Sequence, residues 1–245
     1  MYIIFVALGV AVAMFLVELI CPARQWKIVR HWWLRAIIFN SIQIAIVYLA
    51  TLTWDLWFSG NHVWESKKYL GDGASIFVGY ILITFIYYWW HRMRHDVYFL
   101  WRWCHQLHHS PQRIEILTAF YKHPIELIVN GFLSSLILYV FLGLEPSAVS
   151  QVILITGIAE LFYHWNIKTP YWLGFIFQRP ESHCIHHQYQ HHKNNYSDLP
   201  LWDILFGTFQ NPRESEFMCG FDDSKEQAVI PMLKGKDLYK RKQRK

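Results

Sequence analysis

The sequence predicts an all-α integral membrane protein, a helical bundle of about five spans with a histidine-rich cap at one end. Two observations support this prediction. The chain of 245 residues is 53% hydrophobic and contains 13 Trp, 14 Tyr and 17 Phe, a composition typical of proteins that meet a bilayer. It also contains several apolar stretches of about 17 residues or more, which is the length that a helix needs to cross a membrane.

The first apolar stretch begins at the N-terminus. Residues 2–17 contain no charged side chain, and apart from Glu18 the stretch continues to Ile20. A cleaved signal peptide is the alternative, but it requires a basic segment before the apolar run and small residues at a cleavage site. This run starts MYII and ends LICPARQW, so we expect a retained membrane anchor.

Four further spans are expected along the chain. They cover approximately residues 36–57, 74–90, 126–144 and 147–164. The last two are separated only by the turn GLEP, which is too short for anything except a helical hairpin.

The basic residues predict how the spans are oriented. If five spans alternate across the membrane, 21 of the 23 Lys and Arg residues fall on one side, and only Lys67 and Lys68 fall on the other. Because basic loops usually face the cytoplasm, we expect an N-terminus on the opposite, outer side of the membrane and a cytoplasmic C-terminus; which membrane this is stays open. The cap is therefore expected on the cytoplasmic side.

Histidines are concentrated on this same side. Residues 105–109 read HQLHH and residues 183–187 read HCIHH. Twelve of the 14 histidines are expected on the cytoplasmic side: His91, His95, His105, His108, His109, His123, His164, His183, His186, His187, His191 and His192. His31 and His62 stand apart and are interpreted as ordinary interfacial residues.

The spacing of these histidines indicates a metal site. A helix that continues through HRMRH would place His91 and His95 on one face, and helical spacing would place the three histidines of each HxxHH motif on neighbouring positions. Neutral imidazoles are metal ligands, and nine of them suffice for two ions with open positions. The predicted ligands are His91, His95, His105, His108, His109, His164, His183, His186 and His187. Imidazole suits iron, zinc and copper, so the spacing leaves the element open.

Several motifs resemble those of the fatty acid hydroxylase and sterol desaturase superfamily. They are HRMRH, HQLHHS, FYKHPIE, His164 with Asn166, and HCIHH followed by NYSDLPLWDILFGTF. The resemblance implies two non-haem iron ions held by the histidines, with dioxygen as co-substrate, for hydroxylating or desaturating a lipid C–H bond. It implies no catalytic residue separate from the ligands. It also divides the chain into an N-terminal hairpin region (1–73), a catalytic domain (74–212) and a basic C-terminal tail (213–245).

Five further residues are candidates for the site, and two more are left open. Some members of the superfamily have a histidine where this chain has Glu160, so Glu160 is expected to be a ligand, an acceptor for a histidine N–H, or a packing residue. His123 is either a site residue or the start of a helix at Pro124. Asp96, Asn195 and Asp203 are candidate hydrogen-bond partners for the ligands. His191 and His192 are left open as ligands, a proton route or a solvated loop.

The motifs that are missing predict the partners. The chain has no GxGxxG fingerprint and no cysteine cluster, so a separate electron-donor protein is expected. A lipid substrate is expected to enter from the bilayer, and no nucleic acid is expected to bind; the oligomeric state is left open.

Two other function classes compete with an oxygenase. A metal-binding or transport protein usually places its ligands near the membrane midplane, whereas the interiors of these spans contain no histidine. A zinc hydrolase is expected to carry HExxH, which is absent.

Overall fold

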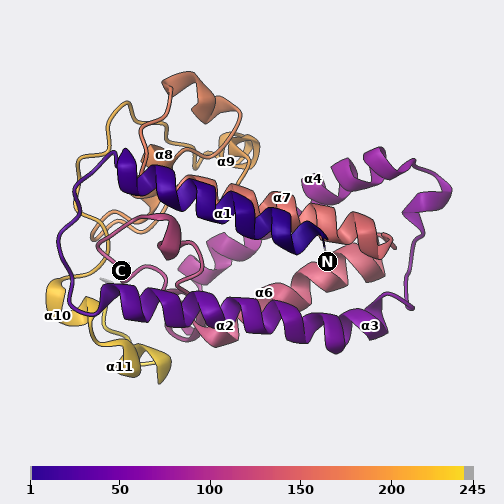
Figure 1. Ribbon diagram of the computed structural model, residues 1–245, viewed down its shortest axis with the longest axis horizontal. Coiled ribbons are helices and arrows are strands. Elements are labelled where there is room, and N and C mark those ends of the chain that lie inside the picture. Colours follow the sequence, from indigo (N-terminus) through magenta and orange to yellow (C-terminus); the bar gives the residue numbers. More distant parts are fainter. Residues whose placement is uncertain (1, 240–245) are drawn as a thin grey trace.

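The computed structural model describes residues 2–239, with the side chains described from residue 5 onward. Figure 1 shows long helices arranged along the longest axis and a cap of shorter helices and loops at one end. Within the described residues the extended pairing is a single antiparallel bridge between Gln188 and Cys219. The all-α prediction is therefore confirmed.

The long helical segments correspond to the expected apolar stretches. They are α1 (Tyr2–Ile20), α2 (Trp32–Leu52), α4 (Asp72–Asp96), α6 (Pro124–Ser135) with its π-helical continuation η4 (Leu136–Phe141), and α7 (Pro146–His164). In the described part of the chain, four helical stretches are long and apolar enough to cross a membrane: Trp32–Phe58, Asp72–Asp96, Pro124–Phe141 and Pro146–His164. These helices indicate a multi-pass membrane protein. Phe5–Ile20 is a shorter apolar helix, so the fifth crossing and the orientation stay predictions.

The hairpin between η4 and α7 depends on Gly143. Its φ of 57° is left-handed, and a Cβ atom there would lie 1.9 Å from the carbonyl oxygen of Trp64. Only glycine combines this backbone conformation with such a close approach. Pro146 then occupies the first turn of α7, where its missing N–H costs no hydrogen bond.

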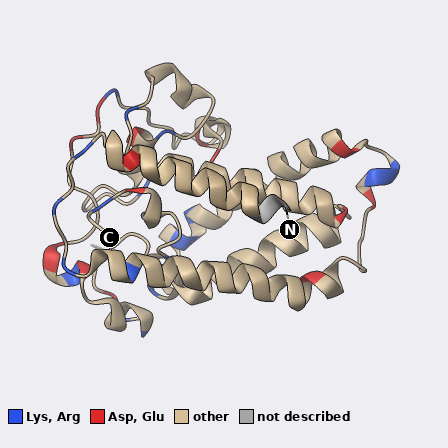
Figure 2. Cartoon of the chain, viewed as in Figure 1, with Lys and Arg blue, Asp and Glu red and all other residues tan. Residues whose placement is uncertain are grey.

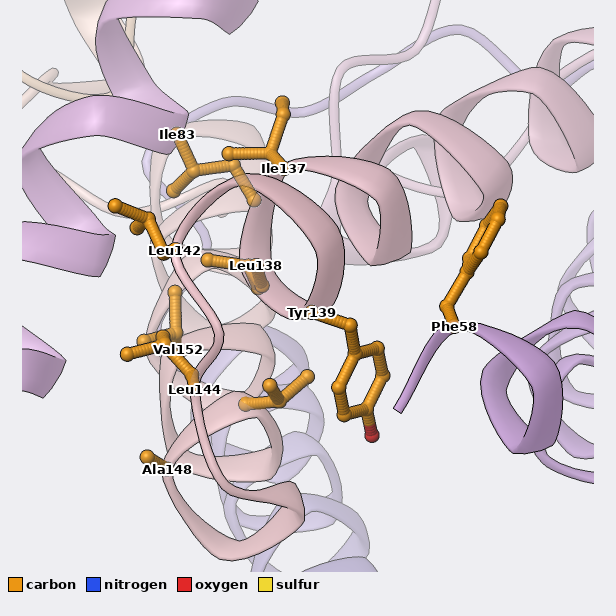
Figure 3. Close-up of a cluster of buried hydrophobic side chains, with 10 residues drawn as sticks. Phe58, Ile83, Ile137, Leu138, Tyr139, Leu142, Leu144, Ala148 and Val152 are labelled. Atoms are coloured by element: carbon orange, nitrogen blue, oxygen red, sulfur yellow. The ribbon is translucent and has the colours of Figure 1, made fainter. Parts of the chain in front are cut away.

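The bundle is held together at the end away from the cap by a buried apolar cluster (Figure 3). Ile83 of α4, Leu138 of η4 and Val152 of α7 meet in this cluster and are at most 2% exposed. Helix α1 packs against α7, and α2 packs against α6. Large apolar side chains such as Leu8 and Leu16 point outward from α1, as expected for surfaces that face lipid.

The shorter elements form the cap and the far turn. They are α3 (Trp54–Phe58), η1 (Ser66–Lys68), α5 (Tyr98–Leu100), the π-helix η2 (Trp101–His105), η3 (Ile116–Thr118), η5 (Tyr171–Phe175), α8 (Pro180–His186), α9 (Pro200–Leu205), α10 (Asp223–Glu226) and α11 (Val229–Leu233). A second buried cluster joins Trp32 of α2 to Trp101 of η2 and Met232 of α11. This cluster fixes the cap to the bundle.

The charges follow the predicted distribution. Figure 2 shows the Lys and Arg residues mainly around the cap, while Lys67 and Lys68 lie in the turn at the opposite end. The division of the chain into residues 1–73, 74–212 and 213–245 stays a prediction. In the last of these ranges, residues 213–239 are folded onto the cap, and residues 240–245 lie outside the described part.

Candidate metal centre

Two groups of buried histidines lie in the cap. Group one is His91, His95, His105, His109 and His186, and group two is His108, His164, His183 and His187. Within each group, one potential ligand atom of every residue lies within 4.8 Å of those of the others. The two groups together contain all nine histidines that the sequence predicted as ligands.

The ends of two long helices supply three of these side chains. Helix α4 continues without a break to Asp96, so His91 and His95 lie one turn apart on one face, as the sequence predicted. His164 is the last residue of α7. Both groups therefore lie where apolar spans end and the cap begins.

The two HxxHH motifs divide between the groups, which the sequence reasoning did not predict. In the first motif, His105 and His109 belong to group one and His108 to group two. In the second motif the assignment is reversed, because His186 belongs to group one and both His183 and His187 belong to group two. Each motif thus bridges the groups instead of serving one site.

Local spacing accounts for the division. In both motifs the two histidines four positions apart share a group, and the histidine three positions after the first belongs to the other group. Residues 106–109 form a turn in which the N–H of His109 donates to the carbonyl of His105 at 3.2 Å. His105 and His109 consequently face one group, and His108 faces the other.

Main-chain carbonyls orient three of the rings. The Nδ1 atoms of His91 and His186 lie 2.7 Å from the carbonyl oxygens of Tyr196 and Asn194. The Nδ1 atom of His164 lies 2.9 Å from the carbonyl oxygen of Glu160. Because a carbonyl can only accept, Nδ1 carries the proton in each ring, and Nε2 is left with a lone pair.

A buried carboxylate orients a fourth ring. The Nδ1 atom of His105 lies 3.1 Å from Oε1 of Glu126, and Glu126 also pairs with the buried guanidinium of Arg94. Arg94 Nη1 is 3.3 Å from the same Nδ1, but the guanidinium is a donor that the carboxylate already engages. The carboxylate therefore accepts from His105 and leaves its Nε2 free to bind.

The lone pairs converge in a way that suits a cation. Nε2 of His91 and Nε2 of His105 are 2.9 Å apart, and Nε2 of His164 and Nε2 of His183 are 3.1 Å apart. The lone pairs of His91 and His105 face each other and repel, whereas a shared metal ion would accept both. Nε2 of His186 is buried without a hydrogen-bond partner among the described residues. The donor set fits metal ions that imidazole prefers.

The electrostatics keep the rings neutral. Burial, together with the neighbouring Arg94, holds the pKa of His105 well below its usual range. Burial, together with His187 and His164, lowers the pKa of His108 in the same way, and burial lowers the pKa of His186 to about 3. Neutral imidazole is the form that binds metal, so these rings are in the protonation state that metal binding requires.

These shifts predict how the stability of the metal-free protein depends on pH. The buried rings stay neutral in the folded state, while those of the unfolded chain titrate near 6.5. Below that pH the unfolded chain binds more protons, so stability is fully present above 6.5 and is lost as the pH falls toward the folded-state values. Each ring adds a slope of up to about 1.4 kcal/mol per pH unit.

Thermal unfolding in detergent with a chelator present measures this dependence. We expect the midpoint to fall steeply between about pH 7 and pH 5. A midpoint that stays constant over that range would contradict the buried, neutral rings.

Glu126 is a site residue that the sequence reasoning missed. It is 0% exposed and lies in the first turn of α6. The signal was its position in FYKHPIE, where an acidic residue begins an otherwise apolar span and therefore needs a buried partner. Its two partners, Arg94 and His105, come from other segments.

Two expected additional residues lie in neither histidine group. His123 caps α6, where its Nδ1 accepts from the N–H of Ile125 at 3.1 Å, and its Nε2 lies 3.2 Å from the carbonyl oxygen of Leu233. The carboxylate of Glu160 pairs with Lys122. Glu160 contacts His164 through its main-chain carbonyl instead.

The three expected hydrogen-bond partners contribute differently. Asp96 is exposed and lies 3.7 Å from Nε of Arg92. Asp203 accepts from the N–H groups of Tyr196 and Ser197 at 2.8 and 3.0 Å. Asn195 donates to the carbonyl of Ser182 at 2.8 Å.

Asp203 and Asn195 therefore act on the histidine rings indirectly. They brace residues 194–196, the loop whose carbonyl oxygens accept from His91 and His186. Asn194 and Asn195 have left-handed φ values of 70° and 50°, a conformation that asparagine adopts more readily than most residues.

The two histidines left open differ in burial. His191 is partly exposed, and its Nε2 lies 3.0 Å from Oδ1 of Asn194. His192 is 3% exposed, and its Nδ1 lies 3.0 Å from Nδ1 of His109. His192 is thus a buried neighbour of group one.

Comparisons with known proteins agree with the motifs. A family model described as fatty acid hydroxylase matches residues 76–208, a range that contains all nine histidines of the two groups. Alkylglycerol monooxygenase of Homo sapiens is 28% identical over 187 residues, which is 74% of this chain and 39% of that protein. Ornithine lipid hydroxylase OlsE of Rhizobium tropici is 31% identical over 158 residues, which is 62% of this chain and 46% of that protein.

A third relative has a different printed activity. Very-long-chain aldehyde decarbonylase of Oryza sativa subsp. japonica is 29% identical over 125 residues, which is 49% of this chain and 48% of that protein. The matches cover less than half the length of these three relatives. No solved structure matches the chain.

Proposed function

Because the chain belongs to the fatty acid hydroxylase family, we propose that it is a membrane-bound oxidoreductase that uses dioxygen to hydroxylate or desaturate a lipid C–H bond. The observation that supports this proposal is the pair of buried histidine groups at the ends of apolar spans. A lipid C–H bond resists acid–base chemistry, so a protein that attacks it needs a redox cofactor.

We propose that each histidine group holds one non-haem iron ion. Group one would use His91, His95, His105, His109 and His186, and group two would use His108, His164, His183 and His187. When bound, iron supplies the electron-transfer chemistry of dioxygen activation that amino-acid side chains lack. The choice of iron rests on the family, because the nitrogen ligands also suit zinc and copper.

The chain contributes orientation and the exclusion of water. The carbonyl oxygens of Tyr196 and Asn194 and the carboxylate of Glu126 hold protons on Nδ1 and direct Nε2 inward. His109 and His186 are 0% exposed. A dry site protects the reacting groups from side reactions with solvent.

We propose that the substrate is a long-chain lipid that enters from the bilayer. His95 lies in the last turn of α4 and His164 ends α7, so both groups are level with the ends of apolar spans. The names of the relatives specify an alkylglycerol, an ornithine lipid and a very-long-chain aldehyde. These molecules share a long apolar chain, which the bilayer would deliver.

The proposal includes a separate electron-donor protein and a cytoplasmic cap. The sequence contains no recognisable nucleotide-binding fingerprint and no cysteine cluster, so the electrons would come from a partner. The basic residues around the cap support a cytoplasmic location.

Lipid masses from producing cells test this function. We expect wild-type cells to accumulate a lipid that has gained one oxygen atom or lost two hydrogen atoms, and cells with His108→Ala at matched levels to lack it. His62→Ala is the control, because His62 is exposed and pairs with Glu65 outside both groups. An unchanged lipid profile, from a wild-type chain that contains iron in cells supplied with the three named lipid classes, would contradict the oxygenase and favour a metal-binding protein.

A further inference from the structure

A tenth histidine lies beside group one without belonging to it. His192 is 3% exposed, and its Nδ1 lies 3.0 Å from Nδ1 of His109. The two rings are nearly perpendicular, at 88°, with their centroids 5.0 Å apart. The contact joins the ring edges and leaves Nε2 of His109 directed at group one.

The neighbouring ligands determine which atom carries the proton. Nε2 of His109 lies 3.1 Å from Nε2 of His105. The latter has a lone pair because the proton of His105 is on Nδ1, which donates to Glu126. For His109 to bind the same ion, its Nε2 must also present a lone pair. Its proton is then on Nδ1, and Nδ1 of His192 is the acceptor.

His192 therefore accepts the hydrogen bond from Nδ1 of His109, as main-chain carbonyls and Glu126 accept those of other predicted ligands. Carbonyl oxygens accept from His91 and His186. The acceptor for His109 is instead the imidazole of His192. A substitution can remove this side chain, whereas it cannot remove a main-chain carbonyl.

The surroundings hold His192 in this position. Its φ of 43° is left-handed, a conformation that histidine and asparagine adopt more readily than most residues. Three aromatic rings surround its imidazole, with centroids at 5.8 Å for Trp101, 5.6 Å for Phe221 and 4.6 Å for Tyr239. Phe221 and Tyr239 also stack on each other at 5.3 Å.

Tyr239 belongs to a C-terminal segment, residues 229–239, that is fastened to the cap. The side chain of Gln106 donates to the carbonyl of Lys236 at 2.9 Å and accepts from the N–H of Leu238 at 3.3 Å. Gly235 has a left-handed φ of 67°, and a Cβ atom there would lie 2.5 Å from the ring of Trp103. The segment thus forms a wall behind His192.

We propose that His192 is a positioning residue of the metal centre, which fixes the tautomer and the ring orientation of His109, and that the C-terminal segment holds His192 in place. The inference depends on the proposed function only because it takes group one to bind a metal ion. It assigns a role to a histidine that lies outside both HxxHH motifs.

Two substitutions separate this role from simple packing. His192→Phe keeps an aromatic ring among Trp101, Phe221 and Tyr239 but cannot accept a hydrogen bond. His192→Asn loses the ring but places its Oδ1 near the former Nδ1 and tolerates the left-handed backbone. A packing role predicts that Phe is the milder change, whereas a positioning role predicts that Asn is.

Cobalt(II) titration in detergent measures the effect, with ligand-field absorption and chelator competition as readouts. We expect His192→Phe to weaken binding at group one by about 10- to 100-fold, and His192→Asn to restore most of it. Thermal unfolding of the metal-free variants measures packing separately, and we expect the larger loss of stability in His192→Asn, which lacks the ring. The same two changes at His31, which is exposed and also left-handed at φ 55°, are matched controls and should leave binding unchanged.

Other results would contradict the positioning role or the proposed function. Wild-type affinity in His192→Phe, or equal losses in Phe and Asn, would overturn the positioning role while the proposed function survives. A wild-type chain that binds no metal would overturn both.

Discussion

Replacing His186 with alanine is expected to remove the metal ion of group one, and replacing its neighbour His187 is expected to remove the ion of group two. The two residues are adjacent in sequence, but their side chains belong to different groups. Each variant should therefore retain roughly one ion per chain. Lipid oxidation should be abolished in both, because the proposed reaction uses both ions.

Metal analysis of the purified chains tests this expectation. Double substitutions show whether each single substitution removes the ion of one group only. His186→Ala combined with His109→Ala should lose no more metal than His186→Ala alone, whereas His186→Ala combined with His187→Ala should lose both ions. Ile185→Val is a control within the same motif, since Ile185 belongs to neither group. Full metal content in either single variant would contradict the assignment of these ligands.

Glu126→Ala is expected to cause the second large effect, on stability as well as on metal binding. Glu126 is the partner of the buried Arg94 and the acceptor for His105. Removing one member of a buried ion pair leaves an uncompensated charge, which costs about 3–5 kcal/mol. His105 would also lose the group that directs its Nε2, so metal affinity should fall as well.

A double substitution separates these two consequences. Arg94→Met with Glu126→Leu removes both charges and should recover most of the unfolding free energy. It should not recover metal affinity, because His105 would still lack an acceptor. Denaturant unfolding and metal titration of the single and double variants provide the test, and recovery of both properties would show that Glu126 has only a structural role.

Local patterns in the sequence were sufficient to predict the helices and the histidines that gather in the two groups. Continuous apolar stretches gave each long helix to within a few residues, and the spacing of His91 and His95 placed them on one face of α4. The nine predicted ligands are the same nine that meet in the two groups. Helical periodicity is a local property, so a short stretch of sequence is enough to recognise it.

The distribution of ligands between the groups was not predictable in the same way. It depends on which other histidines each motif faces, and these come from segments that lie far apart in the sequence. The acceptors behind the ligands depend on distant contacts, since Tyr196 lies 105 positions from His91. Main-chain carbonyls carry no signature in the side-chain sequence, and only the folded loop brings them to the rings.

The use of main-chain carbonyls behind His91, His164 and His186 has a consequence for mutation. A substitution changes a side chain but leaves the peptide carbonyl in place. Changes at Tyr196, Glu160 and Asn194 can therefore affect these hydrogen bonds only by moving the backbone. Loss of one of these supports requires a change in the path of the chain, and not only a change of side chain.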